Sequence, residues 1–150
     1  RNFTKLTGCS GDYIHLLSVT NPMNQELARV AVERFLFSPD AMFWLAEAVV
    51  NDDPAAAMDF YARTTQLDPS DGLAWCRLGR LHENAGDLPG ALEAFEQCCW
   101  NGDPGSNGCW GTGRVYEQMG DIPAAIEVYR MSRWATSQSR ADDLEQSLKP

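Results

Sequence analysis

The sequence predicts an all-α protein built as a solenoid of helical hairpins, and two observations predict it. The first is an internal repeat: Gly86-Asp87 recurs 34 residues later as Gly120-Asp121, and Asp52-Asp53 occupies the same place one period earlier. The second is the spacing of apolar residues, which follows the three-and-four pattern of a helix and not the alternation of a strand. A fixed period of this length indicates two-helix units that stack on their neighbours.

The same shift of 34 residues aligns further positions of the chain. The aligned sets are Ala57, Ala91 and Ala125, then Tyr61, Phe95 and Tyr129, and also Gly79 with Gly113. Several independent matches at one offset indicate tandem repeats, which we place at residues 38–71, 72–105 and 106–139.

Each repeat is expected to form two amphipathic helices joined by a short turn. In the middle repeat the first helix carries an apolar stripe of Trp75, Leu78, Leu81 and His82, and the second carries Leu88, Ala91, Leu92 and Phe95. The first turn of each second helix contains a proline, which needs no hydrogen-bond partner there: Pro54, Pro89 and Pro123. Just ahead of each lies an aspartate that can accept from free backbone N–H groups: Asp53, Asp87 and Asp121.

The middle repeat resembles the tetratricopeptide consensus W-x-x-L-G-x-x-Y followed by A-x-x-x-F. The matching residues are Trp75, Leu78, Gly79, Ala91 and Phe95, with His82 in the tyrosine place. The third repeat keeps Gly113, Tyr116, Ala125 and Tyr129 but has Cys109 where tryptophan is expected, and the first has Leu45 in the glycine place. The resemblance covers about two-thirds of the chain and implies a tetratricopeptide-type solenoid of three repeats.

Further helices are expected at both ends of the repeats, so that residues 1–150 form a single domain. Ser139, with Asp142 three residues on, predicts a capping helix over 139–149 whose Leu144 and Leu148 cover the last repeat. Residues 4–37 are expected to form a degenerate hairpin, with a second helix that opens at Asn21-Pro22.

Composition limits the classes of partner. The chain has 21 acidic and 12 basic residues and a net charge of −9, which would repel a phosphate backbone, so we expect no nucleic-acid partner. No stretch approaches the roughly 20 apolar residues of a membrane span, and no signal peptide is evident, so this segment is expected not to insert into a membrane. Its start at Arg1 suggests a processed protein or a fragment of a longer one.

The five cysteines leave the compartment open between cytoplasmic and extracytoplasmic. Their number is odd and no C-x-x-C pair occurs, so neither a zinc site nor a full disulfide framework is indicated. Buried free thiols are the default expectation. The alternative is one bridge from Cys98 or Cys99 to Cys109, which would contribute about 2–3 kcal/mol and place the protein outside the cytosol.

Nothing in the sequence predicts catalysis, a cofactor or a metal site. Gly105, Gly108, Gly111 and Gly113 crowd together, but no strand precedes them as a phosphate loop requires. We assign Gly113 to close helix packing and Gly105 and Gly108 to the turn between repeats. His15 and His82 lack a nucleophile at readable spacing, so we expect no enzyme.

The resemblance places the first helix of each repeat on a concave face, where a ligand would bind. The outward stripe of these helices is Met42, Ala46 and Val49/Val50, then Cys76, Arg80, Glu83 and Asn84, then Trp110, Arg114, Glu117 and Gln118, with Arg77 beside the second set. Two interpretations of the charges stay open. Each arginine could pair with the glutamate three residues on, adding ~0.2–0.5 kcal/mol. Alternatively Arg77, Arg80 and Arg114 form a cationic cluster for a carboxylate-bearing peptide.

Trp110 beside the cluster is either an apolar anchor for the ligand or a core residue shifted by one place. Phe43 and Gly111 occupy places where the family members that grip chaperone carboxylates have polar residues, so a chaperone co-factor is not predicted.

The predicted function is a protein–protein interaction scaffold that binds a peptide or helix of a partner in its concave groove, with an acidic partner as one option. One alternative, based on resemblance, is a soluble extracytoplasmic accessory domain of a larger membrane-bound cell-envelope polymerase or glycosyltransferase. Another is a self-associating array in which Met42, Phe43 and Val49/Val50 pair two copies as a homodimer.

Overall fold

The structure is a computed structural model that describes residues 38–102 and 107–149. Every regular element in these ranges is an α-helix, which confirms the predicted all-α class. The helices are α3 (Pro39–Val49), α4 (Pro54–Leu67), α5 (Gly72–Asn84), α6 (Leu88–Asn101), α7 (Asn107–Met119), α8 (Ile122–Met131) and α9 (Ala135–Ser147). The degenerate hairpin predicted over 4–37 lies outside the described residues.

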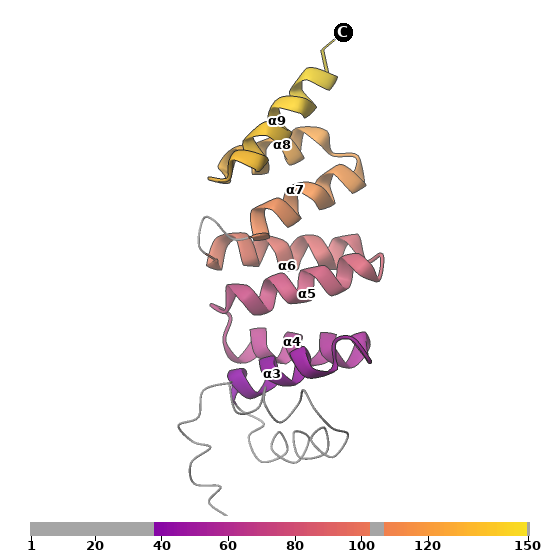
Figure 1. The fold of residues 1–150 in the computed structure, drawn as a ribbon, viewed down its shortest axis with the longest axis vertical. Coiled ribbons are helices and arrows are strands. Elements are labelled where there is room, and N and C mark those ends of the chain that lie inside the picture. Colours follow the sequence, from indigo (N-terminus) through magenta and orange to yellow (C-terminus); the bar gives the residue numbers. More distant parts are fainter. Residues whose placement is uncertain (1–37, 103–106, 150) are drawn as a thin grey trace, which may run out of the picture. The chain divides into compact units, whose positions relative to one another are not determined.

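The chain divides into two compact units, residues 1–69 and 70–150. The first unit contains the hairpin of α3 and α4, and the second contains α5 to α9 (Figure 1). Within the second unit each helix packs on the next along the chain, and α5 also contacts α7 directly. The first helices of the second and third repeats, α5 and α7, are therefore neighbours, as in a stack of helical hairpins.

The predicted aspartate caps are confirmed. Asp53, Asp87 and Asp121 each begin a second helix, and their Oδ1 atoms accept from the backbone N–H three residues on at 3.0, 3.1 and 3.1 Å. Gly86 and Gly120 precede two of these caps with φ of 78° and 82°, a backbone conformation that glycine adopts without strain. The repeated Gly-Asp pair thus ends one helix and starts the next.

Close packing explains several glycines of the second unit. A Cβ atom on Gly79 of α5 would lie 2.9 Å from the ring of Phe95, and one on Gly111 of α7 would lie 2.5 Å from the same ring. Gly113 faces the ring of Tyr129 in the same way, as predicted. The prediction that Gly108 lies in the turn between repeats is wrong. Gly108 lies in the first turn of α7, against the backbone of α6.

The last helix begins earlier than predicted, at Ala135 instead of Ser139. The reason is Gln138, whose side-chain Nε2 donates to the carbonyls of Arg130 and Ser132 at 3.0 and 2.6 Å and so closes the end of α8. These contacts require a helical turn before Ser139. Leu144 is buried as expected, but Leu148 is 58% exposed, so the prediction that both leucines cover the last repeat is wrong for Leu148.

Among the described helices, none combines the length and the apolar character that a bilayer span requires.

Candidate functional site

The first helices of the second unit bring most of the predicted ligand-contacting residues together. We call this surface the α5–α7 face and define it as Arg77, Arg80, Glu83 and Asn84 of α5 with Trp110, Arg114, Glu117 and Gln118 of α7. Because α5 and α7 are in direct contact, side chains from both helices can act on one ligand.

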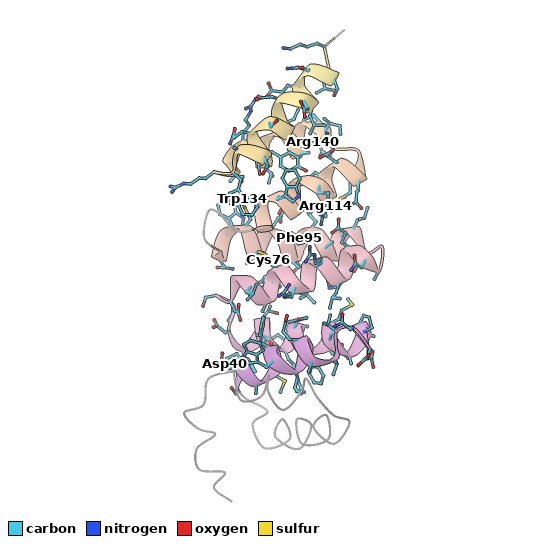
Figure 2. All side chains as sticks on the ribbon, viewed as in Figure 1. Asp40, Cys76, Phe95, Arg114, Trp134 and Arg140 are labelled. Carbon is cyan, nitrogen blue, oxygen red and sulfur yellow. A yellow bond between two sulfur atoms is a disulfide. The ribbon has the colours of Figure 1, made fainter. Side chains whose placement is uncertain are left out.

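Arg114 of α7 (Figure 2) crosses to α5, where it binds Glu83 with both arms of its guanidinium. Its Nε donates to Glu83 Oε1 at 2.8 Å, and its Nη2 donates to Oε2. Gln118 Nε2 donates to the same Oε1 at 2.7 Å. The interpretation that Arg114 pairs with the glutamate three residues on is therefore wrong, because the α5–α7 contact offers a two-point geometry that a neighbour on one helix does not.

Glu117, one period after Glu83, is bound from the other side. Arg140 of α9 (Figure 2) donates to it through Nε at 3.1 Å and through Nη2, and Tyr129 Oη donates to its Oε1 at 2.8 Å. The hydrogen bond from Arg140 lowers the pKa of Glu117 below its ordinary value; partial burial opposes this, and the bond from Tyr129 adds to it. Burial, together with the bond to Glu117, raises the pKa of Tyr129.

Both ion pairs thus join a glutamate to an arginine two helices further along the chain. Glu83 of α5 binds Arg114 of α7, and Glu117 of α7 binds Arg140 of α9. The arginine of the second pair was missed from the sequence, because Arg140 lies in the helix that we assigned to capping.

Arg80 is the arginine of the predicted cluster that stays available to a ligand. It is exposed, and none of residues 38–102 and 107–149 places a carboxylate within ion-pair distance of it. Arg77 is half-buried, and Arg114 is neutralised by Glu83. Of the three predicted cations, Arg80 is therefore the exposed one, and it lies outside the ion pairs of the described residues.

On the stripe predicted for the first repeat, Met42 and Ala46 are core and not surface, whereas Val49 and Val50 are half-buried. Met42 and Ala46 are completely buried, and Phe43 is 8% exposed. Met42 packs with Leu45 and Phe60, so its side chain is not presented to a ligand. Of the residues predicted to pair two copies, Met42 and Phe43 are therefore buried, and Val49 and Val50 keep partial exposure.

Trp110 supports the core interpretation. Its ring is half-buried, with its centroid 5.1 Å from that of Tyr129, and it packs against the cluster of Ala125, Tyr129, Ala141 and Leu144. Only part of the ring is left to contact a ligand.

Four of the cysteines form two disulfides in the second unit, Cys76–Cys98 and Cys99–Cys109, with Cα atoms 5.1 and 4.6 Å apart. The sequence had left Cys98 and Cys99 as alternative partners of Cys109, and it did not predict the bridge from Cys76. The repeat pattern could have indicated this bridge, because the start of the first helix of a hairpin, where Cys76 lies, meets the end of the second helix, where Cys98 lies. Cys76 is therefore a bonded cysteine on the predicted stripe and not a free ligand-contacting thiol.

The histidine in the consensus tyrosine place has a structural role. His82 Nδ1 lies 2.8 Å from Asp87 Oδ2, which ties the end of α5 to the residue that caps α6. Within the described ranges, no group of three or more His, Cys, Asp or Glu side chains is placed to hold a metal ion.

Residues 48–105 match the family model of the tetratricopeptide repeat. The general transcriptional corepressor CYC8 of Saccharomyces cerevisiae is 40% identical over 45 residues, which make up 30% of this chain and 5% of the length of that protein.

Solved structures show the same fold. A crystal structure of MamA superposes with a TM-score of 0.67 at 22% identity, covering 83% of this chain and 68% of that one. A thermophilic tetratricopeptide protein of Thermus thermophilus, TTC0263, gives a TM-score of 0.60 at 15% identity, covering 95% and 84%. In general this fold is a scaffold for protein–protein interaction. Residues 48–105 thus match the tetratricopeptide repeat, and the helical hairpins of the described residues have the fold of the solved tetratricopeptide structures.

Proposed function

We propose that the second unit binds a peptide or helix of a partner protein along the α5–α7 face, with a carboxylate of the partner held by Arg80. The observation that carries this proposal is Arg80 itself: an exposed arginine to which the described residues offer no carboxylate, in a chain of net charge −9. Arginine binds carboxylates in a two-point geometry, which gives an acidic partner both affinity and orientation.

The surroundings of Arg80 support the proposal because they are already ordered. Glu83, three residues on, is held by Arg114 and Gln118, so it is engaged before a partner arrives. A face whose side chains are fixed in advance loses less conformational entropy on binding. Asn84 and Gln118 are exposed beside it and can donate to a peptide backbone.

The test selects peptides from a displayed library of random sequences on the full chain, and compares the wild type with Arg80→Glu. We expect the wild type to enrich acidic peptides, and Arg80→Glu to lose them. Arg133→Glu is the matched control, since Arg133 is also an exposed arginine of the second unit but lies outside the α5–α7 face. Arg114→Glu is unsuitable, because it would place a second carboxylate against Glu83.

Circular dichroism of both variants shows whether the helices are intact. Acidic peptides that bind Arg80→Glu as well as they bind the wild type would refute the role of Arg80. Selection without an acidic bias would refute an acidic partner.

The two disulfides favour a second, compatible proposal, that this segment works outside the cytosol as an accessory domain of a larger cell-envelope protein. Disulfides persist in oxidising compartments and are rare in the cytosol. The test is to alkylate thiols at the moment of lysis of the native cells and to count the labelled cysteines by mass. With two bridges among the five cysteines of this segment, we expect one of the five to be labelled, whereas labels on all five would contradict the proposal.

A further inference from the structure

The two disulfides meet at one point of the fold. Cys98 and Cys99 are consecutive residues in the last turn of α6, and each is bonded to a different helix, Cys98 to α5 and Cys99 to α7. Helix α6 is therefore joined covalently to both first helices of the α5–α7 face.

The sulfur of Cys98 lies close to the helix that carries Cys109. A Cβ atom on Gly108 would lie 2.7 Å from Cys98 Sγ, and Gly108 directly precedes Cys109 in the first turn of α7. Because Gly108 has no side chain, nothing from that residue separates Cys98 from α7. The Cys98–Cys109 bond, the other pairing that the sequence left open, thus needs only a local movement.

The four bonded cysteines differ in burial, and the two buried ones are not bonded to each other. Cys98 and Cys109 are 0% and 5% exposed, whereas Cys76 and Cys99 are half-buried. Each disulfide therefore joins one buried cysteine to one half-buried cysteine.

We propose that the four cysteines form a disulfide relay, in which a dithiol reductant converts the two bonds into a single Cys98–Cys109 bond and two accessible thiols. A reductant thiolate attacks Cys99 Sγ, and Cys109 leaves as a thiolate. The second thiol of the reductant releases Cys99, so the reductant becomes a disulfide and two electrons and two protons pass to the protein. The Cys109 thiolate then attacks Cys98 Sγ, the Cys98–Cys109 bond forms, the Cys76–Cys98 bond breaks, and Cys76 leaves and takes a proton.

Entry at the other accessible sulfur reaches the same product. Attack at Cys76 releases the Cys98 thiolate, which displaces Cys99 from Cys109. In both routes one S–S bond forms as another breaks in the exchange step, so that step needs no electrons. The surviving bond joins the two buried sulfurs, where a second reductant molecule reaches it least easily.

The consequence for binding rests on the proposed function. Cys76 is four residues before Arg80 on α5, and its release frees the start of α5 from α6 at the edge of the α5–α7 face. Reduction would then alter ligand binding while α6 and α7 remain bonded to each other.

The relay is tested on the full chain with Cys9→Ser, which removes the fifth cysteine. Limiting dithiothreitol is added, exchange is stopped with acid, and free thiols are alkylated and located by fragmentation mass spectrometry. The two-electron-reduced species should carry labels on Cys76 and Cys99. Labels on Cys99 and Cys109 together, or on Cys76 and Cys98 together, would overturn the relay.

A second experiment, on a variant and without reductant, covers the case in which both disulfides are reduced before the two-electron-reduced species accumulates. In Cys99→Ser, Cys109 is free from the start, so we expect a population with the Cys98–Cys109 bond and a free Cys76 thiol. Exclusive retention of Cys76–Cys98 would overturn the proposal. Cys109→Ser is the matched control, since it removes the attacking thiol and should leave Cys76–Cys98 intact. Neither measurement uses a ligand, so a failure of the peptide-binding proposal would leave the relay standing.

Discussion

The α6–α7 junction and the α8–α9 junction occupy the same place in successive repeats, yet different chemistry closes them. At α6–α7 the Cys99–Cys109 bond holds the helices, and Gly108 lets their backbones approach closely. One period later the places of the two bonded cysteines are taken by Arg133 and Asp143, both exposed.

The α8–α9 junction replaces the covalent bond with polar contacts. Gln138 donates to carbonyls at the end of α8, and Arg130 Nη2 binds Asp142 and Glu145 at 2.6 and 3.0 Å. The buried place of Cys98 is kept as Ser132, which is 3% exposed. The two junctions therefore share a place in the repeat but differ in the chemistry that closes them.

The sharpest way to test this comparison is to remove the disulfide of one junction and its counterpart in the other. For Cys99→Ser with Cys109→Ser we expect a loss of about 2.5 kcal/mol in the free energy of unfolding, because the bond closes a loop of sequence separation 10. The matched variant, Arg133→Ser with Asp143→Ser, changes exposed side chains and should stay within about 0.5 kcal/mol of the wild type. Urea unfolding measures both. Equal losses would show that the two junctions do not differ as described.

The features predictable from the sequence are those that depend on neighbours along the chain or on the period. The caps Asp53, Asp87 and Asp121 and the close packing at Gly113 belong to this group, because helix starts and the repeat pattern determine them. The expectation of free thiols was wrong, and the bond from Cys99 to Cys109 was only an alternative to it. That alternative left Cys98 and Cys99 open as partners, since only the rotation of α6 about its axis decides between the two adjacent cysteines.

The features that escaped prediction depend on which helices face one another. One of the two interpretations left open by the sequence paired Arg114 with Glu117 of its own helix, whereas the α5–α7 contact brings it to Glu83. Met42 and Ala46 follow the same stripe as Arg80 in sequence, but they are buried while Arg80 is exposed. Periodicity assigns a side chain to a face of its helix and does not reveal what lies against that face.

The next largest effect is expected from Gln138, the residue that closes the α8–α9 junction. Gln138→Ala removes the donor to the carbonyls of Arg130 and Ser132, and we expect a loss of about 1–2 kcal/mol in urea unfolding. Gln146→Ala, at an exposed position of the same helix, is the control and should change stability little. If both variants behave alike, the start of α9 does not depend on Gln138.

A smaller effect that depends on pH is expected at Glu117, which links α7 to both α8 and α9. The pKa of Glu117 is lowered in the folded state, so its contribution is present above the ordinary pKa of a glutamate and is lost as pH falls through the lowered value. Glu117→Gln should therefore melt below the wild type at pH 7, and the two melting curves should converge below about pH 4. Glu127→Gln, at an exposed position, should show no such convergence. A gap that stays constant with pH would rule out ionised Glu117 as its source.

The smallest effect is expected at Arg130, because its pairs with Asp142 and Glu145 are exposed to solvent. Exposed ion pairs gain little, since water already solvates the charges and the side chains lose freedom. Arg130→Met keeps an apolar side chain about as long as the aliphatic stem of arginine and removes the charge, so we expect a small drop in the urea midpoint at low salt. At molar salt, where charges are screened within roughly 3 Å, the drop should vanish. A drop that survives molar salt would mean that the aliphatic stem of Arg130, and not its charge, holds α9 against α8.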